Sequence, residues 1–258
     1  MEAQPNPNSY KLTTFEKIVE LSRPWLLLGS YIVLASFNIW WLAIPVAVAT
    51  VMGGFVQMHD AIHNSLGLSK PATNFVLTMS ALLLLKSGHA IRVTHLRHHG
   101  QCLGDEDPEG EPAKWTLKQV FLNGAYHVFT MRFTSLKMAP ATRNIQLLET
   151  AITFLLLVAF ILLYYFTGSI IPLVYWGVAF VLSCLMPLWA SYIPHKLASK
   201  NPARLAAVKM AHVWTPIISS FAFHHLHHVY PKVPTALLPK AAKELPEPDD
   251  DHDDYYPH

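Results

Sequence analysis

The chain has 258 residues, of which 52% are hydrophobic and only 14% are charged. An average soluble domain carries about 25% charged residues, and the mean hydropathy here is positive, at +0.28. The composition excludes an ordinary soluble domain and predicts an all-α, polytopic membrane protein. The net charge of +2 singles out no partner, and we expect no nucleic-acid partner. Cys102 and Cys184 provide neither a thiolate cluster nor a disulfide framework.

The first elements predicted along the chain form one membrane hairpin. The polar residues 1–13, rich in Pro and Asn, are expected to be disordered, and Phe15–Leu21 to form a short interfacial helix. Two spans follow, roughly Ser22–Phe37 and Ile39–Met58, with aromatic residues at the turn between them. The second span leads directly into His59.

The middle of the chain combines a short apolar stretch with interfacial segments. Ala72–Leu85 has only 14 residues, too few to cross a bilayer, so we expect a re-entrant or buried helix. A helix through Ile91–His99 follows, and Gln101–Pro112 is an acidic loop. Trp115–Met138 mixes aromatic, apolar and basic residues, which is typical of an interfacial helix.

A second hairpin is predicted in the last part of the chain. Its spans are expected at about Leu147–Phe166 and Ile170–Ile193, and Ala211–Phe223 is another short apolar stretch. The acidic residues 241–258 are expected to be a disordered tail. These boundaries give one membrane domain over residues 14–240.

The distribution of basic residues predicts the orientation of the spans. All 19 Lys and Arg residues fall in the blocks Lys11–Arg23, Lys70–Arg143 and Lys196–Lys243. Each gap between blocks is long enough for two helices of about 20 residues. Two hairpins, with four spans in all, therefore place every basic residue on one side, which the positive-inside rule makes cytoplasmic. We expect both termini and the metal site on that side.

Three groups of histidines in the patterns HxxxH, HxxHH and HHLHH indicate metal chemistry. Residues three or four apart share a helix face, so each group directs several imidazoles toward one region. Neutral imidazole suits iron, zinc, copper and nickel. Because one ion does not need so many ligands, we predict a two-metal centre. The predicted ligands from these groups are His59, His63, His95, His98, His99, His224, His227 and His228.

Residues beside these groups have alternative roles. His195 ends the last predicted span, where it is either a ninth ligand or a solvated interfacial residue. His225 faces away when its neighbouring ligand faces inward, so it is left out of the predicted set. Asp60 is a candidate to accept the second N–H of a ligand imidazole. Asp105 and Asp107 could accept from ligand imidazoles in the same way or could cap and turn their acidic loop, and we favour the capping role.

The motifs HDAIH, THLRHH, YIPHK and FHHLHHVYPKVPTALLP, between Gln57 and Pro239, resemble those of the membrane fatty acid desaturase superfamily. These integral di-iron enzymes include acyl desaturases and carotenoid hydroxylases and ketolases. The resemblance implies that the eight histidines bind two Fe ions, that His195 is a further ligand and that O2 is a substrate. Because no electron-transfer domain is attached, we expect a separate donor such as ferredoxin or a cytochrome.

The resemblance implies a membrane-embedded lipid substrate, either a fatty acyl chain or a carotenoid. We expect a fatty acyl desaturase, with a carotenoid (beta-carotene) hydroxylase or ketolase as the alternative. A metal transporter is disfavoured because the spans lack ionisable residues at mid-membrane. A membrane zinc hydrolase would use fewer histidines and a carboxylate base. The predicted re-entrant helix and the aromatic residues Trp189, Tyr192 and Trp214 are candidates to line a substrate channel.

Overall fold

The computed structural model describes residue 6, residues 9–196, residue 206, residues 208–210 and residues 215–245. Every regular element among these residues is a helix, which confirms the predicted all-α class. The longer helices are α1 (Thr14–Ser36), α2 (Trp40–Ile62), α3 (Lys70–Leu83), α4 (Gly88–Gly100), α5 (Leu117–Met138), α6 (Arg143–Thr167) and α7 (Ile171–Cys184). The shorter ones are η2 (Glu111–Lys114), η3 (Pro140–Thr142), the π-helix η4 (Pro187–Tyr192), α8 (Ile193–Lys196), α10 (Thr215–Ala222), α11 (His224–Val229), η5 (Thr235–Leu237) and α12 (Leu238–Glu244).

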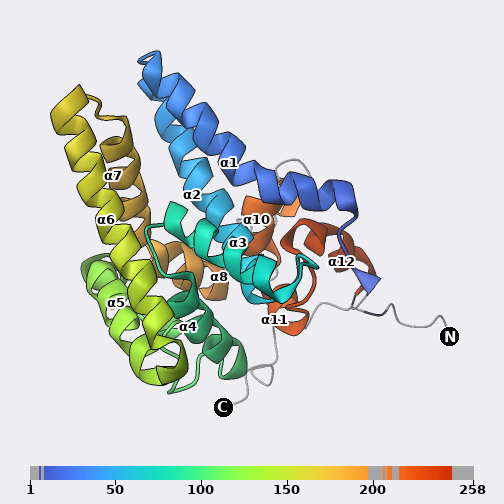
Figure 1. The fold of residues 1–258 in the computed structure, drawn as a ribbon. Coiled ribbons are helices and arrows are strands. Elements are labelled where there is room, and N and C mark those ends of the chain that lie inside the picture. The colour runs from blue at the N-terminus through green and yellow to red at the C-terminus, as the bar shows by residue number, and fades with distance from the viewer. Residues whose placement is uncertain (1–5, 7–8, 197–205, 207, 211–214, 246–258) are drawn as a thin grey trace.

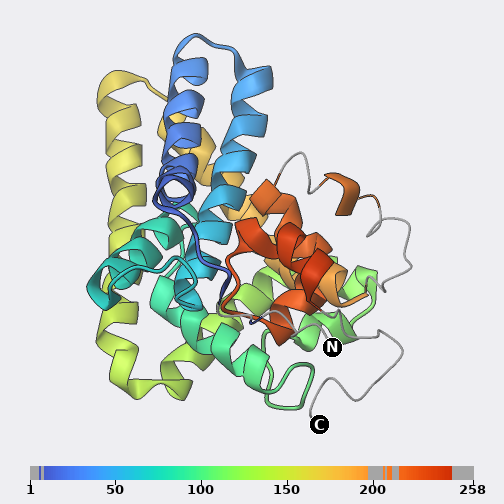
Figure 2. The ribbon, with the colours of Figure 1, turned by 90° about the vertical axis from the view of Figure 1, so that its right-hand side faces the viewer.

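Two helical hairpins, α1–α2 and α6–α7, stand beside each other and point the same way (Figures 1 and 2). The first turns through Asn38 and the second through Gly168, with φ of 59° and 71°, values that suit Asn and Gly. Three described helices are long and apolar enough to cross a membrane, and up to five spans result if each of two bent helix pairs counts as one. The predicted count of four lies inside this range.

Helix α1 joins two elements that the sequence predicted separately. The expected interfacial helix Phe15–Leu21 and the first span are one helix with Pro24 inside it. A capping box starts the helix, because the Thr13 hydroxyl accepts from the Glu16 N–H and the Glu16 carboxylate accepts from the Thr13 N–H. An internal proline removes one backbone hydrogen bond and bends a helix. The change of direction along α1 is visible in Figure 1.

The predicted fourth span is a bent element rather than one straight helix. Helix α7 ends at Cys184, and η4 with α8 continues the chain at an angle of 46°. Pro187 opens η4, where its missing N–H interrupts the helical hydrogen-bond ladder. The bend carries α8 to the histidine-bearing helices.

Helices α3 and α4 meet at an angle of 101°, which agrees with the prediction of a short helix that turns back. Gly88 lies at this crossing, and a Cβ atom there would come within 2.7 Å of the Leu77 carbonyl oxygen. A glycine therefore lets α4 start directly against α3. The turn aims α4, with the second histidine group, toward the end of α2.

Two apolar clusters hold the helices. The larger one joins α1, α2, α3 and α7, and the smaller one packs α11 and α12 against Tyr10. The Tyr10 hydroxyl donates to Glu244 Oε2 at 2.6 Å, so both ends of the described chain meet. The folded part thus includes residues beyond the predicted limits at 13 and 240. The rest of the acidic tail lies outside the described residues.

Candidate metal centre

The structure brings all the predicted ligands together at the ends of four helices. The first histidine group ends α2, the second lies in α4, and the third forms α11. His195 comes from α8. Most of these imidazoles are buried or nearly so, although their chain positions span more than half of the sequence.

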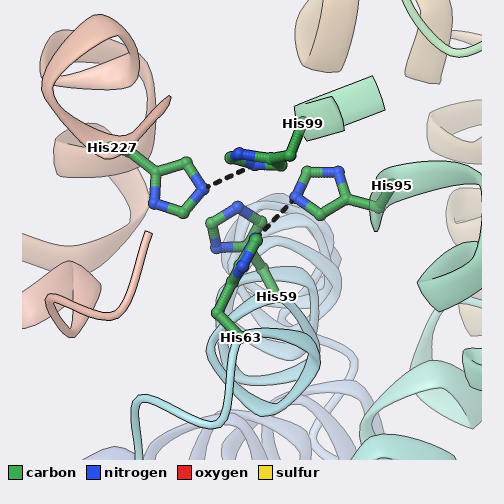
Figure 3. Close-up of side chains that lie close together, drawn as sticks. All are labelled: His59, His63, His95, His99 and His227. Atoms are coloured by element: carbon green, nitrogen blue, oxygen red, sulfur yellow. Dashed lines mark hydrogen bonds between the residues drawn. The ribbon is translucent and has the colours of Figure 1, made fainter. Parts of the chain in front are cut away.

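The imidazoles form two adjoining sets whose nitrogen atoms lie within 4.8 Å of one another in each set. Set A contains His59, His63, His95, His99 and His227 (Figure 3). Set B contains His98, His195, His224 and His228. The two sets touch, because the rings of His99 and His228 are stacked with centroids 4.3 Å apart.

The HxxHH spacing explains how the second and third groups divide between the sets. His95 and His99, four residues apart on α4, face set A, whereas His98 faces set B. The third group does the reverse: its pair at i and i+4 joins set B, and its i+3 residue, His227, joins set A. On an α-helix the residue at i+4 lies about 40° around the axis from residue i, and the residue at i+3 lies about 60° from residue i in the opposite direction. The residues at i+3 and i+4 therefore point about 100° apart. Each HxxHH group therefore bridges the two sets.

Pairs of Nε2 atoms in both sets lie at separations that suit a shared ion. In set A, Nε2 of His63 is 3.0 Å from Nε2 of His95. In set B, Nε2 of His195 is 3.2 Å from Nε2 of His98 and 3.0 Å from Nε2 of His224. Two nitrogens at a right angle on an ion with bonds of about 2.1 Å are about 3 Å apart. The nitrogens therefore converge as ligands of one ion would.

Two carboxylates from the acidic loop hold imidazoles of α4. Nδ1 of His95 lies 2.7 Å from Glu109 Oε1, and Nδ1 of His98 lies 2.7 Å from Asp107 Oδ2. A carboxylate that accepts from Nδ1 fixes the tautomer with its lone pair on Nε2. Asp107 also accepts from the N–H groups of Glu109 and Gly110, so it turns the loop as predicted and holds His98 as well.

Burial favours the neutral form of two imidazoles of the third histidine group. Burial, and then the neighbouring imidazoles, lower the pKa of His227 and of His228 well below the ordinary histidine value. Neutral imidazole is the form that binds a metal ion. Burial opposes ionisation of Asp107, but its hydrogen bonds from His98 and two backbone N–H groups outweigh burial and lower its pKa.

Asp60 has a different partner from the one expected. Its carboxylate accepts from the Thr235 hydroxyl at 2.6 Å and from the Thr235 N–H at 3.2 Å. The distance from Asp60 Oδ1 to His59 Nδ1 is 3.8 Å, longer than a hydrogen bond. Asp60 therefore ties the end of α2 to the segment that follows α11.

The sequence did not point to Glu109, and for Asp107 it favoured the turn-forming role over the histidine contact that the structure also shows. The signal was present, since both acids lie in the short acidic loop directly after the second histidine group. Spacing along a loop does not predict which side chain folds back, however. Of the suggested channel-lining residues, Trp189 packs edge-on against Phe55, and Trp214 lies outside the described residues.

Comparisons with known proteins agree with this geometry. A family model described as fatty acid desaturase matches residues 39–258. A beta-carotene ketolase from Paracoccus sp. (strain PC1) is 24% identical over 253 residues, covering 90% of this chain and 95% of that protein. Another from Paracoccus sp. (strain N81106 / MBIC 01143) is 23% identical over 199 residues, 73% of each chain. No solved structure is significantly similar.

Proposed function

The chain belongs to the fatty acid desaturase family, and from this premise we propose that it is an O2-dependent di-iron oxidoreductase acting on a membrane lipid. One observation carries the proposal: five imidazoles converge in set A and four in the adjoining set B. A single metal ion does not need this many ligands, and the two sets share the α4 and α11 histidine groups. Two ions held side by side account for the whole arrangement.

The residues present fit two iron ions. Set A would hold one ion and set B the other, with Nε2 of His95 and His98 directed inward by the carboxylates on Nδ1. Imidazole suits iron as it suits zinc, but a catalytic zinc site commonly uses three protein ligands and one open position. Sets of five and four exceed that number, which disfavours the zinc hydrolase. When bound, the irons would supply the redox chemistry that activates O2.

The protein's own part in such a reaction is to orient ligands and exclude water. Glu109 and Asp107 fix two imidazoles, and Asp60 anchors the segment after α11 through Thr235. The site is buried within the packed ends of four helices. Burial limits side reactions with solvent and preserves the geometry of the ligands.

Two lipid classes are candidates for the substrate. Membership of the fatty acid desaturase family supports an acyl chain as the substrate and fatty acyl desaturation as the reaction. The similar proteins are named beta-carotene ketolases, which supports a carotenoid equally. We propose a lipid that reaches the site from the membrane, since α6 exposes many large apolar side chains of the kind that face lipid. A separate protein, such as a ferredoxin or a cytochrome, would deliver electrons.

The test is product formation in a host that contains both fatty acids and beta-carotene. We expect the full chain to yield a new desaturated acyl lipid or a new oxygenated carotenoid, and the His98→Ala and His228→Ala variants to yield none. His195→Ala should also lose most turnover. His225→Ala is the matched control, because it lies in α11 outside both sets. Unchanged lipids and pigments with well-expressed, iron-loaded protein would contradict the proposal.

A further inference from the structure

A cavity of about 390 Å³ lies between α4, α5, α6, α7 and η4. Most of its wall is apolar and includes Phe154 of α6 and Trp176 and Phe180 of α7. Thr94 and Glu109 line it as well, and Glu109 accepts a hydrogen bond from the set A imidazole of His95. The cavity therefore extends from membrane-facing helices to a residue that contacts the metal centre.

Two cationic side chains, Lys86 and Arg132, line this apolar cavity. Both have N–H donors that lack an acceptor among the described residues. Lys86 donates no hydrogen bond and forms no ion pair within the described residues. Arg132 donates from Nη2 to the Gln146 carbonyl oxygen, but its Nη1 is buried without a partner in the described part of the chain. A buried donor without an acceptor is costly, and such exceptions call for an explanation.

Two buried carboxylates in this region already accept hydrogen bonds from other side chains. Glu109 accepts from Thr94 and His95. The buried carboxylate of Glu149 accepts from Thr78, Ser87 and His89. Neither carboxylate forms a direct bond with Lys86, so within the described part of the chain neither of them supplies the missing acceptor.

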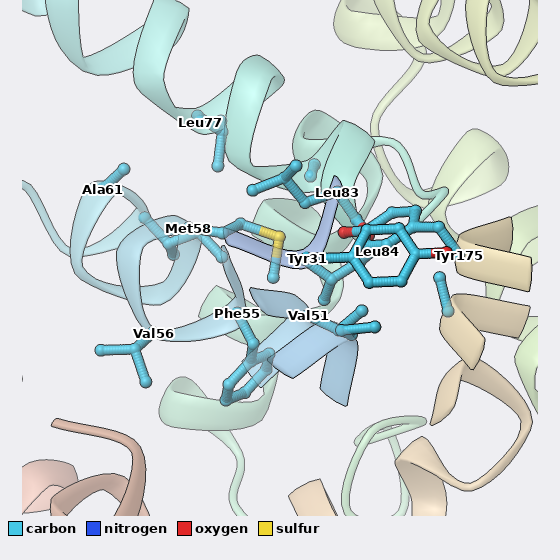
Figure 4. Close-up of a cluster of buried hydrophobic side chains, with 14 of the residues drawn as sticks. Tyr31, Val51, Phe55, Val56, Met58, Ala61, Leu77, Leu83, Leu84 and Tyr175 are labelled. Carbon is cyan, nitrogen blue, oxygen red and sulfur yellow. The ribbon is translucent and has the colours of Figure 1, made fainter. Parts of the chain in front are cut away.

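The turn that carries Lys86 is fixed in place. The Tyr175 hydroxyl donates to the Leu83 carbonyl at 2.9 Å, and the Ser183 hydroxyl donates to the Leu84 carbonyl at 3.0 Å. Figure 4 shows Tyr175 beside this turn. Leu85 has φ of 57°, which is unfavourable for a bulky residue. A strained, tethered backbone of this kind is found where a side chain is held for a function.

We propose that this cavity binds one end of an amphipathic lipid, whose acceptor oxygen receives hydrogen bonds from Lys86 and Arg132. The oxygen belongs to a carboxylate or carbonyl of an acyl lipid, or to an oxygenated ring of a carotenoid. A pure hydrocarbon leaves both donors unpaired and binds more weakly. This inference rests on the proposed function for the identity of the reaction, but the binding step needs neither metal nor turnover.

The experiment measures binding to the purified full chain in lipid nanodiscs by energy transfer from tryptophan to a polyene lipid. The probes are cis-parinaric acid and the same polyene with a methyl group in place of the carboxyl. We expect the acid to bind at least about tenfold more tightly, the increment expected for a charge-assisted hydrogen bond. Lys86→Met should abolish that difference, and Lys86→Arg should keep most of it. Lys137→Met, exposed on α5, is the matched control.

Competition distinguishes the two sources of the oxygen. Displacement of the probe by a fatty acid alone assigns the site to acyl lipids, and displacement by a ketocarotenoid but not by beta-carotene assigns it to carotenoids. Equal binding of the acid and hydrocarbon probes, or an unchanged difference in Lys86→Met, overturns the proposal. Loss of all binding in Lys86→Met together with Lys86→Arg overturns it too, because charge would not be the cause. Intact binding in a protein without oxidase activity would reject the proposed function alone.

Discussion

At the scale of single residues, carboxylates in the acidic loop orient the candidate ligands of α4. Glu109 and Asp107 each accept from an Nδ1 at 2.7 Å and leave Nε2 directed at the two sets. One imidazole belongs to set A and the other to set B. A single loop therefore acts on both candidate ions.

Glu109→Gln is expected to lower metal affinity by about 10- to 100-fold, the usual cost of losing such a partner. The amide keeps the size of the side chain but removes the charge that polarises His95. Metal occupancy during titration with a chelator measures the effect. Asp105→Asn is the control, since Asp105 is exposed in the same loop. Equal occupancy in both variants would show that Glu109 does not support a ligand.

Asp60 and Thr235 are expected to act as one unit that secures the third histidine group. Asp60→Ala and Thr235→Val should each destabilise the protein by roughly 1–3 kcal/mol, because each removes a hydrogen bond between the two buried side chains. The double variant should cost clearly less than the sum of the two. Thermal unfolding of the four proteins in detergent measures this coupling, and strict additivity would argue against it.

The residues of the candidate site are largely predictable because their spacing is local. Helical periodicity identifies the three histidine groups, and the end of the last predicted span points to His195. The sequence did not predict the roles of Glu109 and Thr235, because their partners lie on other elements. Nor did it predict that Lys86 lines a cavity, which depends on how the chain folds back. The division of each HxxHH group between two sets likewise depends on how α4 and α11 face each other.

At the scale of elements, close approach at glycines sets the helix crossings. Gly88 allows α4 to start against α3, and Gly124 lets α5 approach the Cys184 carbonyl oxygen, where a Cβ would lie at 2.7 Å. The predicted short helix Ala72–Leu85 matches α3 in length, and α3 turns sharply into α4. The predicted fourth span Ile170–Ile193 is bent, because Pro187 and the π-helix η4 redirect the chain. Hydropathy alone does not reveal such a bend.

Gly88→Ala is expected to destabilise the protein by about 1–3 kcal/mol, because the new methyl group would overlap the Leu77 backbone. The α3–α4 turn would shift, and iron occupancy should fall with it. Gly177→Ala in α7 is the matched control, with nothing within 4 Å of its Cβ position. The unfolding temperature of the control should equal or slightly exceed that of the parent protein. A neutral Gly88→Ala would show that the crossing tolerates a methyl group.

At the scale of the whole molecule, both hairpins point away from the histidine-bearing half (Figures 1 and 2). The orientation predicted from the basic residues, which groups every Lys and Arg on one side of the membrane, stays a prediction. The apolar surface of α6 and the two hairpins support an integral membrane protein. The metal centre would then lie at the membrane surface, where O2, the lipid and a soluble electron donor all have access.

Both termini are expected to be cytoplasmic, by the positive-inside rule applied to the three basic blocks. A cysteine-reactive reagent that does not cross membranes, applied to tags at either end, measures this in intact cells and in inverted vesicles. Labelling should require inverted vesicles for both tags. Labelling of only one terminus in intact cells would mean an odd number of spans, and labelling of both would mean that the orientation is reversed.

The metal content of the purified full chain tests the central claim most directly. Two sets of buried imidazoles predict about two iron atoms per chain in protein prepared without a chelator. His98→Ala and His228→Ala should lower the iron content, and His195→Ala should do so too if it is a ligand as proposed, whereas His225→Ala should leave it unchanged. One zinc and no iron in the parent protein would contradict the di-iron account.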